Sequence, residues 1–594
     1  MCGIVGYVGD KQAQSILINC LRRLEYRGYD SCGVAVAFDE IEVYKDAVRV
    51  EALGKTLPSL QGMIGVGHTR WATHGAPSQV NAHPHLDCTG NIAVVHNGVI
   101  SNFEALKKLL VSEGHRFVSE TDTEVIPHLI EKYYDGDLVK AVAAALADIE
   151  GSYAVIVLRA GEPGLVAIRK DNPLIIGVSD RENFIASDVP AILDYTDRVI
   201  YLEDGDIGVV TKDEIKISRN GAVVKWKENK VSWGVEEAQK AGYEHFMLKE
   251  IHEQPRVIRN TLGEYTRATE SMGDLAVIRD TGSEPVLILA CGTSYHAALI
   301  GKNIFEELLR IPVRVELASE FNYYSQTLPR TVAIALTQSG ETADILKAMK
   351  KLKEIGCRVI AITNVVGSTV SRIASQTIYT QAGPEISVPA TKTFMAQLMV
   401  LYWLVTSYSR ADAKRLASLL MELRQLPSKV QQVLDNESKI VEYAQYLARY
   451  DNVFFIGRGI NLPVALEGAL KLKEISYIHA EAYAAGEMKH GPFALLSGST
   501  PVIAIVARDS TYNAMLTNIK EVKARGAPLI ALVGEGEEAV EGLADLVIAV
   551  PRVDPVFSPV VNTVALQLLA YYAAKERGCS IDFPRNLAKS VTVE

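Results

Sequence analysis

Residues 285–294 have the sequence Pro-Val-Leu-Ile-Leu-Ala-Cys-Gly-Thr-Ser, and residues 452–459 have the sequence Asn-Val-Phe-Phe-Ile-Gly-Arg-Gly. Each segment is a short apolar run followed by a glycine-containing turn, and a helical pattern begins soon afterwards, at Tyr295 and at Leu462. This order predicts a buried strand, a loop and a helix. The two copies lie about 167 residues apart, which indicates an internal repeat.

Further pairs of apolar runs keep a similar spacing. The first members are 331–336, 358–363 and 376–380, and their counterparts are 501–506, 528–533 and 546–550. Strand–loop–helix units repeated in this way predict two doubly wound α/β domains with parallel sheets. Such sheets bind ligands beyond the carboxyl ends of their strands, so the loops at those ends are candidate binding loops.

The region before the repeat has a different pattern. It contains β-branched apolar runs such as Ile92–Val95 and Tyr153–Leu158, and helical periodicity at Ala13–Leu24 and Thr123–Tyr133. The polar, glycine-interrupted segment 226–242 is typical of a linker. We therefore expect an α/β and α+β multidomain chain, with a first domain at 1–238, a linker and helix at 239–275, repeat domains at 276–425 and 440–580, and a tail at 581–594.

Composition and charge exclude several classes of protein. The chain has 594 residues, of which 48% are hydrophobic and 22% charged, as in folded globular proteins. A net charge of -10 and the lack of a long Lys/Arg run argue against a nucleic-acid partner. Seven scattered cysteines without a CxxC pair predict neither a disulfide framework nor a structural zinc site. Since no signal-peptide pattern is present, we expect a cytoplasmic protein.

Two apolar stretches, 393–409 and 555–574, are long enough to be considered as membrane spans. Both contain several polar residues, and the second also contains Pro and Asn. We expect buried core or subunit-interface helices and no membrane partner.

Cys2 directly follows the initiator methionine, so removal of Met1 would leave a thiol and a free α-amine on one residue. An α-amine has a pKa of roughly 8, and it can therefore accept the thiol proton near neutral pH without a histidine. Taken alone, Cys2 is more simply explained as an early strand residue. The hypothesis of a nucleophile depends on three other segments.

Those segments supply the other parts of an amide-cleaving site. Arg70 can clamp a carboxylate with two hydrogen bonds, and Trp71 beside it can act as a lid. Asn97 and Gly98 follow an apolar strand, where an amide side chain and a backbone N–H can form an oxyanion hole. Asp122 opens a helix and can receive an amino group. Together these groups suit the substrate glutamine.

The same motifs carry a resemblance to a known family. Segments 1–6, 24–31, 68–75, 81–85 and 96–98 resemble the class II glutamine amidotransferase domains, which are N-terminal-nucleophile hydrolases with an αββα sandwich. Within that group they resemble the glutamine–fructose-6-phosphate amidotransferase (glucosamine-6-phosphate synthase) family. The resemblance implies Cys2 as nucleophile, Asn97 and Gly98 as oxyanion hole, and Trp71 as ammonia gate. It implies glutamine binding by Arg70, Trp71, Thr73, His74, His83 and Asp122. His83 and His85 have no carboxylate at ligand spacing, so we expect no metal site there.

Two loops after the repeat strands are rich in hydroxyl groups. Residues 337–342, Thr-Gln-Ser-Gly-Glu-Thr, lie between a predicted strand and helix, and with the helix N-terminal amides they form an anion cradle. Cys291–Ser294 adds a second such turn at the neighbouring strand end. Either loop alone is equally explained by ordinary helix caps. Together they favour a phosphate, and the lack of a P-loop lysine favours a phosphorylated metabolite over ATP.

Glu467, Lys471 and Glu474 have the i, i+4, i+7 spacing of one helix face, for which a solvated ion-pair face is the usual explanation. His490 lies in a following loop and is a candidate acid–base group for opening a sugar ring. Lys589 lies in a Pro-Arg-Asn-containing tail, where a docked lysine can form an imine with a ketose.

The second half resembles two sugar-isomerase (SIS) domains of the same family, most strongly at 465–470, 471–479, 481–492 and 582–594. The resemblance implies Glu474 as the base that moves a proton between C1 and C2, His490 in ring opening, and Lys589 as the imine-forming residue with Lys471 nearby. It implies sugar-phosphate contacts from Cys291, Gly292, Thr293, Ser294, Thr337, Gln338, Ser339, Thr342, Val388 and Ala588. Amine, thiol and carboxylate groups supply this chemistry, so we expect no metal and no organic cofactor.

The expected activity is the glutamine-dependent conversion of fructose 6-phosphate to glucosamine 6-phosphate and glutamate in a homodimer, with ammonia channelled between two sites, as the first step of hexosamine synthesis. One departure leaves alternatives open. Residues 388–392 are Val-Pro-Ala-Thr-Lys where the family usually has Val-Ala-Ser-Thr-Lys, so a hydroxyl is lost at Ala390. A different ketose or a cyclic polyol phosphate is therefore an alternative acceptor. A glutaminase with a sugar-phosphate-sensing module is another, although such a sensor would need neither Lys589 nor Glu474.

Overall fold

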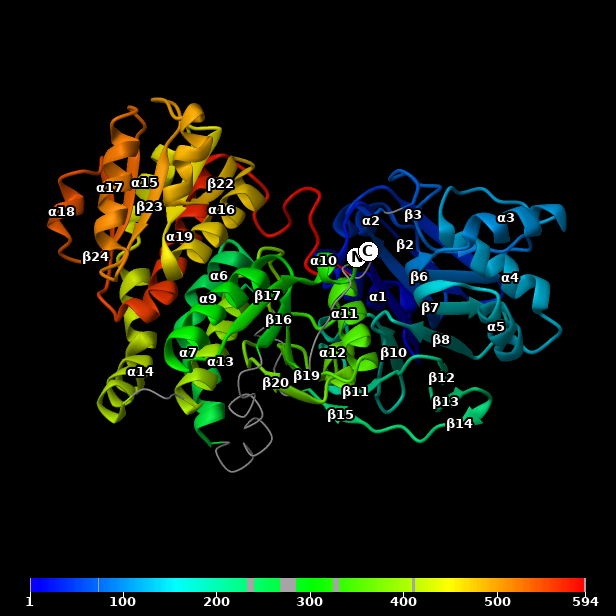
Figure 1. Cartoon of the computed structure of the whole chain (residues 1–594). Coiled ribbons are helices and arrows are strands. Elements are labelled where there is room, and N and C mark those ends of the chain that lie inside the picture. The colour runs from blue at the N-terminus through cyan, green and yellow to red at the C-terminus, as the bar shows by residue number, and fades with distance from the viewer. Residues whose placement is uncertain are drawn as a thin grey trace. The chain divides into compact units, whose positions relative to one another are not determined.

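The chain forms two compact units. The computed structural model describes residues 2–72, 74–231, 240–267, 285–323, 331–408 and 412–591. The first unit comprises residues 1–238 and 588–594, and the second comprises residues 239–587. Figure 1 shows the helices and strands of both units.

The first unit contains two antiparallel sheets. The strand order of the first sheet is β15-β11-β9-β10-β1-β4-β2-β3, and that of the second is β14-β13-β12-β8-β7-β6-β5. The strands are β1 (Gly3–Val8), β2 (Ser31–Ala37), β3 (Ile41–Asp46), β4 (Ile64–Arg70), β5 (His85–Leu86), β6 (Ile92–Ile100), β7 (Gly151–Arg159), β8 (Gly164–Lys170), β9 (Ile175–Gly177), β10 (Asn183–Ala186), β11 (Arg198–Tyr201), β12 (Asp206–Thr211), β13 (Ile215–Arg219), β14 (Ala222–Val223) and β15 (Asn229–Lys230). The helices are α1 (Ala13–Arg22), α2 (Val50–Thr56), α3 (Phe103–Ser112), α4 (Val125–Tyr133) and α5 (Leu138–Ala147), with 3-10 turns η1 (Glu25–Arg27), η2 (Asp122–Glu124) and η3 (Val189–Ala191).

The two sheets pack face to face because alternate residues of their strands are apolar. One buried layer between them contains Ile4, Val66 and Ile156. Helix α1 covers the outer face of the first sheet, where a side chain at Gly67 would lie 2.9 Å from Leu21 Cδ1. Helices α3, α4 and α5 cover the outer face of the second sheet with a separate apolar cluster. The expected αββα sandwich is confirmed.

The second unit contains two parallel sheets with the same topology. Their orders are β17-β16-β18-β19-β20 and β22-β21-β23-β24-β25. The strands are β16 (Val286–Ala290), β17 (Val313–Leu317), β18 (Val332–Leu336), β19 (Arg358–Thr363), β20 (Gln376–Tyr379), β21 (Asn452–Gly457), β22 (His479–Ala484), β23 (Val502–Val506), β24 (Leu529–Gly534) and β25 (Leu546–Val550). The predicted doubly wound repeat is confirmed. The edge strands β17 and β22 were missed, because most of their side chains are partly exposed and they lack the continuous apolar run of a buried strand.

Helices surround both parallel sheets. They are α6 (Phe246–His252), α7 (Gln254–Arg267), α9 (Gly292–Leu308), α10 (Ala318–Phe321), α11 (Ala343–Glu354), α12 (Thr369–Ile373), α13 (Lys392–Tyr408), α14 (Ala413–Asp435), α15 (Ser438–Leu447), α16 (Leu462–Ser476), α17 (Tyr512–Lys523), α18 (Glu538–Glu541) and α19 (Ser558–Glu576), with 3-10 turns η6 (Gly459–Asn461), η7 (Ala485–His490), η8 (Pro492–Leu495) and η9 (Pro555–Phe557). The segment expected to be a linker and helix, 239–275, contains α6 and α7 of this unit, and its part after Arg267 lies outside the described residues.

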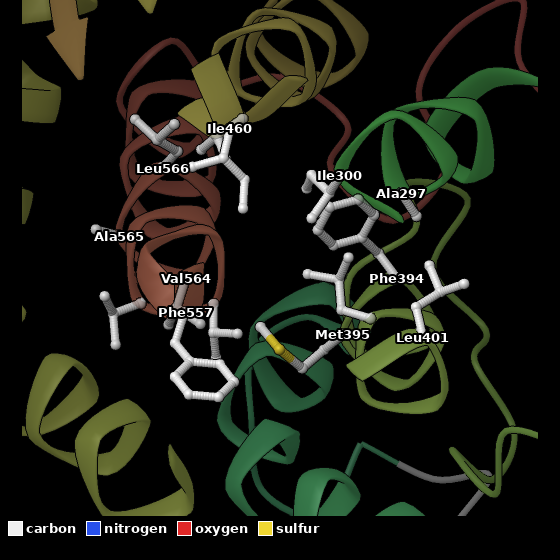
Figure 2. Close-up of a cluster of buried hydrophobic side chains, with 14 of the residues drawn as sticks. Ala297, Ile300, Phe394, Met395, Leu401, Ile460, Phe557, Val564, Ala565 and Leu566 are labelled. Carbon is white, nitrogen blue, oxygen red and sulfur yellow. The ribbon is translucent and has the colours of Figure 1, made fainter. Parts of the chain in front are cut away.

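One apolar core joins the two repeats. Figure 2 shows Phe394 and Met395 of α13 close to α9, and Val564 and Leu566 of α19 beside Ile460 of the second repeat. Among the described residues one helix, Pro555–Glu576, is long and apolar enough to cross a membrane, but 94% of its apolar window is buried inside the structure. The two apolar stretches are therefore core helices, as expected from their polar residues.

Candidate functional sites

Cys2 lies immediately before β1, beside the end of β4. The backbone N–H of Trp71 donates a hydrogen bond to Cys2 Sγ at 3.2 Å. The backbone oxygen of Cys2 accepts hydrogen bonds from Asn97 Nδ2 at 2.8 Å and from Arg27 Nε at 3.2 Å. Burial raises the pKa of the Cys2 thiol, although the Trp71 N–H and the Arg70 guanidinium oppose this rise. A base is therefore needed to form the thiolate near neutral pH.

The expected oxyanion-hole residues lie in β6, beside the thiol-bearing residue. Asn97 is buried, and its Oδ1 has no hydrogen-bond partner within the described part of the chain. Gly98 has φ of +134°, and a Cβ there would lie 2.0 Å from the backbone oxygen of Ser152. Only glycine fits such a position, since both the backbone conformation and the neighbouring strand exclude a side chain. The sequence pair Asn-Gly is thus explained by the local structure.

Arg70 and Asp122 lie close enough to Cys2 to act on its charge in opposite directions. Arg70 Nη2 donates to the backbone oxygens of His74 and, at 3.0 Å, of Gly75. Its Nη1 is buried without a hydrogen-bond partner in the ranges that the structure describes. A buried guanidinium nitrogen of this kind is costly unless a ligand supplies an acceptor. Asp122 Oδ2 accepts the N–H of Ile100 at 2.8 Å, which fixes the carboxylate.

Buried histidines line the inner side of this site. The rings of His68 and His83 stack with centroids 4.0 Å apart, and the His85 ring meets His83 edge-on at 4.7 Å. Burial lowers the pKa of His68 to about 3 and lowers the pKa values of His83 and His85 well below their usual range, so all three are neutral. Direct contact of His83 with glutamine stays a prediction, because its ring is enclosed in this stack.

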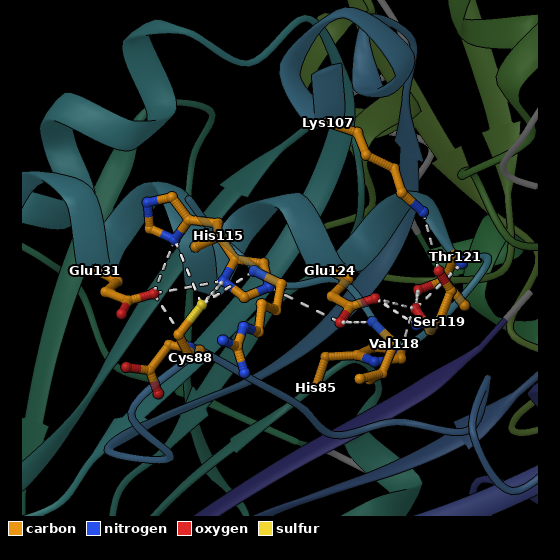
Figure 3. A network of polar contacts seen from close by, with 12 residues as sticks. His85, Cys88, Lys107, His115, Val118, Ser119, Thr121, Glu124 and Glu131 are labelled. Atoms are coloured by element: carbon orange, nitrogen blue, oxygen red, sulfur yellow. Dashed lines mark hydrogen bonds and ion pairs between the residues drawn. The ribbon is translucent and has the colours of Figure 1, made fainter. Parts of the chain in front are cut away.

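A polar network positions the segment that carries Asp122. Glu124 accepts hydrogen bonds from the N–H groups of Val118 and Ser119, at 2.8 and 2.7 Å (Figure 3). Thr121 Oγ1 lies 3.1 Å from His85 Nε2, and Asn81 exchanges two hydrogen bonds with Glu120. Sequence analysis missed these positioning residues, because nothing in their spacing shows that they meet.

The hydroxyl-rich loops lie side by side at the carboxyl edge of the first parallel sheet. Strands β16 and β18 are neighbours, and the chain leaves β16 toward β17 on the other side, so these loops flank the topological switch point. In one loop Gly340 has φ of +68°, and a Cβ there would lie 2.2 Å from Ser368 Oγ. Thr342 precedes α11 and Cys291 precedes α9, and neither side chain caps its helix. The remaining predicted loop residues are Gly292, Thr293, Ser294, Thr337, Gln338 and Ser339.

The charged face of α16 meets the first repeat. Lys471 Nζ lies 2.5 Å from Glu474 Oε2 and 3.6 Å from Glu467 Oε1, and it donates to Thr293 Oγ1 at 3.1 Å. Lys471 is fully buried, which lowers its pKa, but Glu474 and Glu467 outweigh burial and raise that pKa above its usual value. Glu467 and Lys471 are buried and Glu474 is partly exposed, so the three charged groups do not form the solvated ion-pair face that is usual for this spacing.

Comparisons with known proteins agree with both sites. A glutamine amidotransferase domain matches residues 68–194, and SIS domains match residues 282–407 and 446–577. Over 100% of both chains, the sequence is 50% identical to the glutamine–fructose-6-phosphate aminotransferase (isomerizing) of Caldanaerobacter subterraneus subsp. tengcongensis and 48% identical to that of Thermococcus kodakarensis. The chain belongs to the glutamine–fructose-6-phosphate aminotransferase family.

A solved structure supports the fold of the second half of this aminotransferase. The C-terminal domain of glucosamine-fructose-6-phosphate aminotransferase from Francisella tularensis is 35% identical, with a TM-score of 0.54. It aligns with 58% of this chain and with 100% of its own length. Together with the matched domains, this shows that the predicted enzyme class and domain types are correct.

The remaining residues that the sequence predicted for the two sites lie in several different segments of the chain. Val388 donates its N–H to the backbone oxygen of Asp582 at 3.0 Å, and the Asp582 carboxylate accepts two N–H groups at the start of α6. His490 is exposed at the end of η7. Ala588 and Lys589 are partly buried and group with the first unit, so their contribution to a sugar site stays a prediction. Thr73 lies outside the described residues, and His74 packs its ring edge-on against Phe103.

Proposed function

We propose that this chain converts L-glutamine and fructose 6-phosphate into glutamate and glucosamine 6-phosphate. The observation that carries the proposal is the arrangement around Cys2: a thiol held by the Trp71 N–H, beside the Asn97 amide and a buried Arg70 nitrogen that has no acceptor among the described residues. The two hydroxyl-rich loops supply a phosphate site in the same chain, as the family name requires.

In the glutaminase reaction Cys2 acts as the nucleophile once Met1 is removed. Its α-amine takes the thiol proton, and the thiolate adds to the side-chain amide carbon of glutamine. Asn97 Nδ2 and the Gly98 N–H stabilise the resulting oxyanion, for which Asn97 gives up its bond to the Cys2 carbonyl. Ammonia leaves with the transferred proton, and water then hydrolyses the thioester to glutamate. Arg70 holds the substrate carboxylate and Asp122 its amino group.

In the sugar reaction the hydroxyl-rich loops hold the phosphate of fructose 6-phosphate. The Lys589 amine condenses with the C2 carbonyl of the open ketose and releases water, after ring opening assisted by His490. Ammonia displaces Lys589 at C2, and Glu474 moves a proton from C1 to C2 to give the 2-amino aldose. Lys471 keeps Glu474 in place through its ion pair at 2.5 Å.

Three further parts belong to the same proposal. Free ammonia in water at neutral pH is mostly protonated, so a dry passage past Trp71 preserves the nucleophile.

We infer a cytoplasmic homodimer, in line with the sparse, unpaired cysteines and the long apolar helices. The acceptor is fructose 6-phosphate despite Ala390, since the preceding residues 386–388 are held by hydrogen bonds from their N–H groups to the Glu250 carboxylate and the Asp582 backbone oxygen.

The test is mass spectrometry of the products formed from glutamine plus fructose 6-phosphate, with sugar-free and glutamine-free controls. Equal amounts of glutamate and glucosamine 6-phosphate are expected. Glutamate alone would refute the acceptor, and other ketose and cyclic polyol phosphates would then be screened. Lys589→Ala is expected to keep glutamine hydrolysis and lose sugar amination, and amination at a near-normal rate would refute the imine.

A further inference from the structure

Four potential metal ligands meet on the first unit, outside the glutaminase site. Cys88 lies in the turn after β5, and His115 lies between α3 and η2. His128 and Glu131 lie on α4 at i and i+3, and therefore on one face of the helix. Figure 3 shows the side chains of Cys88, His115 and Glu131 pointing toward one another. Among the described residues, this is the group of His, Cys, Asp or Glu side chains whose ligand atoms lie close enough together to hold a metal ion, and it combines a thiol with imidazoles.

The distances between the ligand atoms match the edges of one coordination tetrahedron. Cys88 Sγ lies 3.5 Å from His128 Nδ1 and 3.7 Å from His115 Nδ1. Glu131 Oε2 lies 3.0 Å from His115 Nδ1 and 3.4 Å from His128 Nδ1. With Zn–S near 2.3 Å and Zn–N or Zn–O near 2.0 Å, a tetrahedral site has edges of about 3.5 Å between sulfur and nitrogen and about 3.3 Å between nitrogen and oxygen. The remaining pairs of ligand atoms lie within 4.8 Å of one another, so small side-chain adjustments suffice to place one ion among all four.

The surroundings support ligands of negative charge. The N–H of Arg116 donates to Cys88 Sγ at 3.3 Å, and the N–H of Cys88 donates to Glu131 Oε2 at 3.1 Å. His128 is almost fully buried, and its Nε2 has no hydrogen-bond partner among the residues described. This nitrogen lies 3.8 Å from the carboxylate of Glu124, and metal-bound histidines commonly direct their second N–H at a carboxylate. Cys88 is exposed, which leaves an entry path for the ion.

We propose that Cys88, His115, His128 and Glu131 bind a structural Zn²⁺ ion. Binding forms a Zn–S bond and releases the thiol proton to water, and no redox change is involved. Four protein ligands fill the tetrahedron, so no position is left open for a substrate. The ion ties the turn after β5 to α4 and to the start of the segment 115–124, which carries Asp122. The sequence-based expectation of no metal site relied on the absence of a CxxC pair, and this set has only one cysteine.

The first experiment measures the zinc content of the purified full-length chain. We expect about one zinc ion per chain, as for a closed structural site. Cys88→Ser and His115→Gln should each lower the content at least about tenfold at fixed low free zinc, because loss of even an outer-shell partner commonly lowers metal affinity by about 10- to 100-fold. Cys579→Ser, a partly exposed thiol in the second unit, should keep full content. Zinc that stays in Cys88→Ser, or a wild-type chain that neither contains nor takes up zinc, overturns the proposal.

Cobalt substitution gives a second test, whose result does not depend on the yield of folded variant protein. The chelator-treated wild-type chain is incubated with Co²⁺, and a thiolate-to-cobalt charge-transfer band is expected in the near ultraviolet. The band should be absent from Cys88→Ser and unchanged in Cys579→Ser, with circular dichroism confirming that both are folded. A band that persists in Cys88→Ser assigns the metal to another thiol and overturns the site. Mg²⁺ should not compete with Co²⁺, since it prefers oxygen ligands.

Discussion

The glutaminase site and the sugar-phosphate site are built in different ways. In the first unit a single sandwich supplies every group, and Cys2, Trp71 and Asn97 are joined by direct hydrogen bonds. In the second unit both repeats contribute residues to one polar cluster, since Thr293 of the first repeat forms hydrogen bonds with both Lys471 and Glu467 of the second. If the proposed residue roles hold, the difference teaches that duplication of a fold lets one copy keep the binding loops while the other supplies acid–base groups.

The corresponding loops of the two repeats differ in the side chains that they carry. Where the first repeat has hydroxyl groups at its switch point, the second has Arg458 and Arg508, and both side chains have protein partners. Arg458 donates to Asn518 Oδ1 at 2.9 Å, and Arg508 pairs with Glu537 at 2.5 Å. We therefore expect phosphate to bind at the loops of the first repeat and not at those of the second.

The largest expected effect is the loss of glutamine-dependent activity in a variant that still binds fructose 6-phosphate. Cys2→Ala should lower glutamine hydrolysis and glutamine-dependent product about 10⁴-fold or more, because no other group replaces the thiolate. The Kd for fructose 6-phosphate, measured by calorimetry, should change less than about twofold, because the sugar loops belong to the other unit. Cys579→Ser is the matched control. Glutamine-dependent product from Cys2→Ala would contradict the assignment of the nucleophile.

The second prediction concerns a variant that should lose the sugar reaction but keep glutamine hydrolysis. Glu474→Gln keeps the size of the side chain but removes the base, so formation of glucosamine 6-phosphate should fall about 10²- to 10⁴-fold. Glutamine hydrolysis should stay within about twofold of wild type, because the glutaminase residues belong to the other unit. The same assay reports both rates. If the two activities fall together, the sites are not separable and the comparison fails.

A matched pair of substitutions sharpens the contrast between the repeats. Thr342→Val removes a hydroxyl from the cradle of the first repeat and should raise KM for fructose 6-phosphate about tenfold, the worth of one hydrogen bond to a charged group. Thr511→Val changes the corresponding loop of the second repeat, where the hydroxyl donates a hydrogen bond to Asp509 Oδ1. Its KM should be unchanged. Equal effects of both variants would mean that both repeats bind phosphate.

Sequence reasoning succeeded where the pattern reports burial. The apolar runs before Cys291 and Gly457 predicted buried parallel strands, because a strand covered on both faces must be apolar throughout. The residue types at Cys2, Asn97 and Asp122 predicted an amide-cleaving site, and the structure places them in one unit with direct contacts between the first two.

Sequence reasoning failed where distant segments meet. The half-exposed edge strands β17 and β22 have no continuous apolar run, and Asn81 and Glu124 position the Asp122 segment through contacts that no local spacing encodes. The same is true of Cys88, which the fold brings to the face of α4 that carries His128 and Glu131. Periodicity reports which side of an element is buried, but not which other element covers it.

The last prediction concerns stability and should have the smallest effect on turnover at neutral pH. We expect acid to destabilise the first unit. His68, His83 and His85 are neutral when folded, because burial lowers their pKa values, to about 3 for His68. In the unfolded chain they take up protons below about pH 6.5. The stability they provide is therefore present above that pH and is lost as the pH falls toward 3, by about 1.4 kcal/mol per pH unit for each ring.

Thermal unfolding of the full chain at pH 7.5, 6.5 and 5.5 measures this loss. His83→Gln removes one titrating ring, so its unfolding free energy should fall less steeply with acid than that of the wild type, whatever its stability at pH 7.5. His479→Gln, at an exposed position in the second unit, should leave the slope unchanged. The slope is the informative quantity, since any packing defect at position 83 shifts stability equally at every pH. A wild-type slope in His83→Gln would show that this ring is not held neutral by burial.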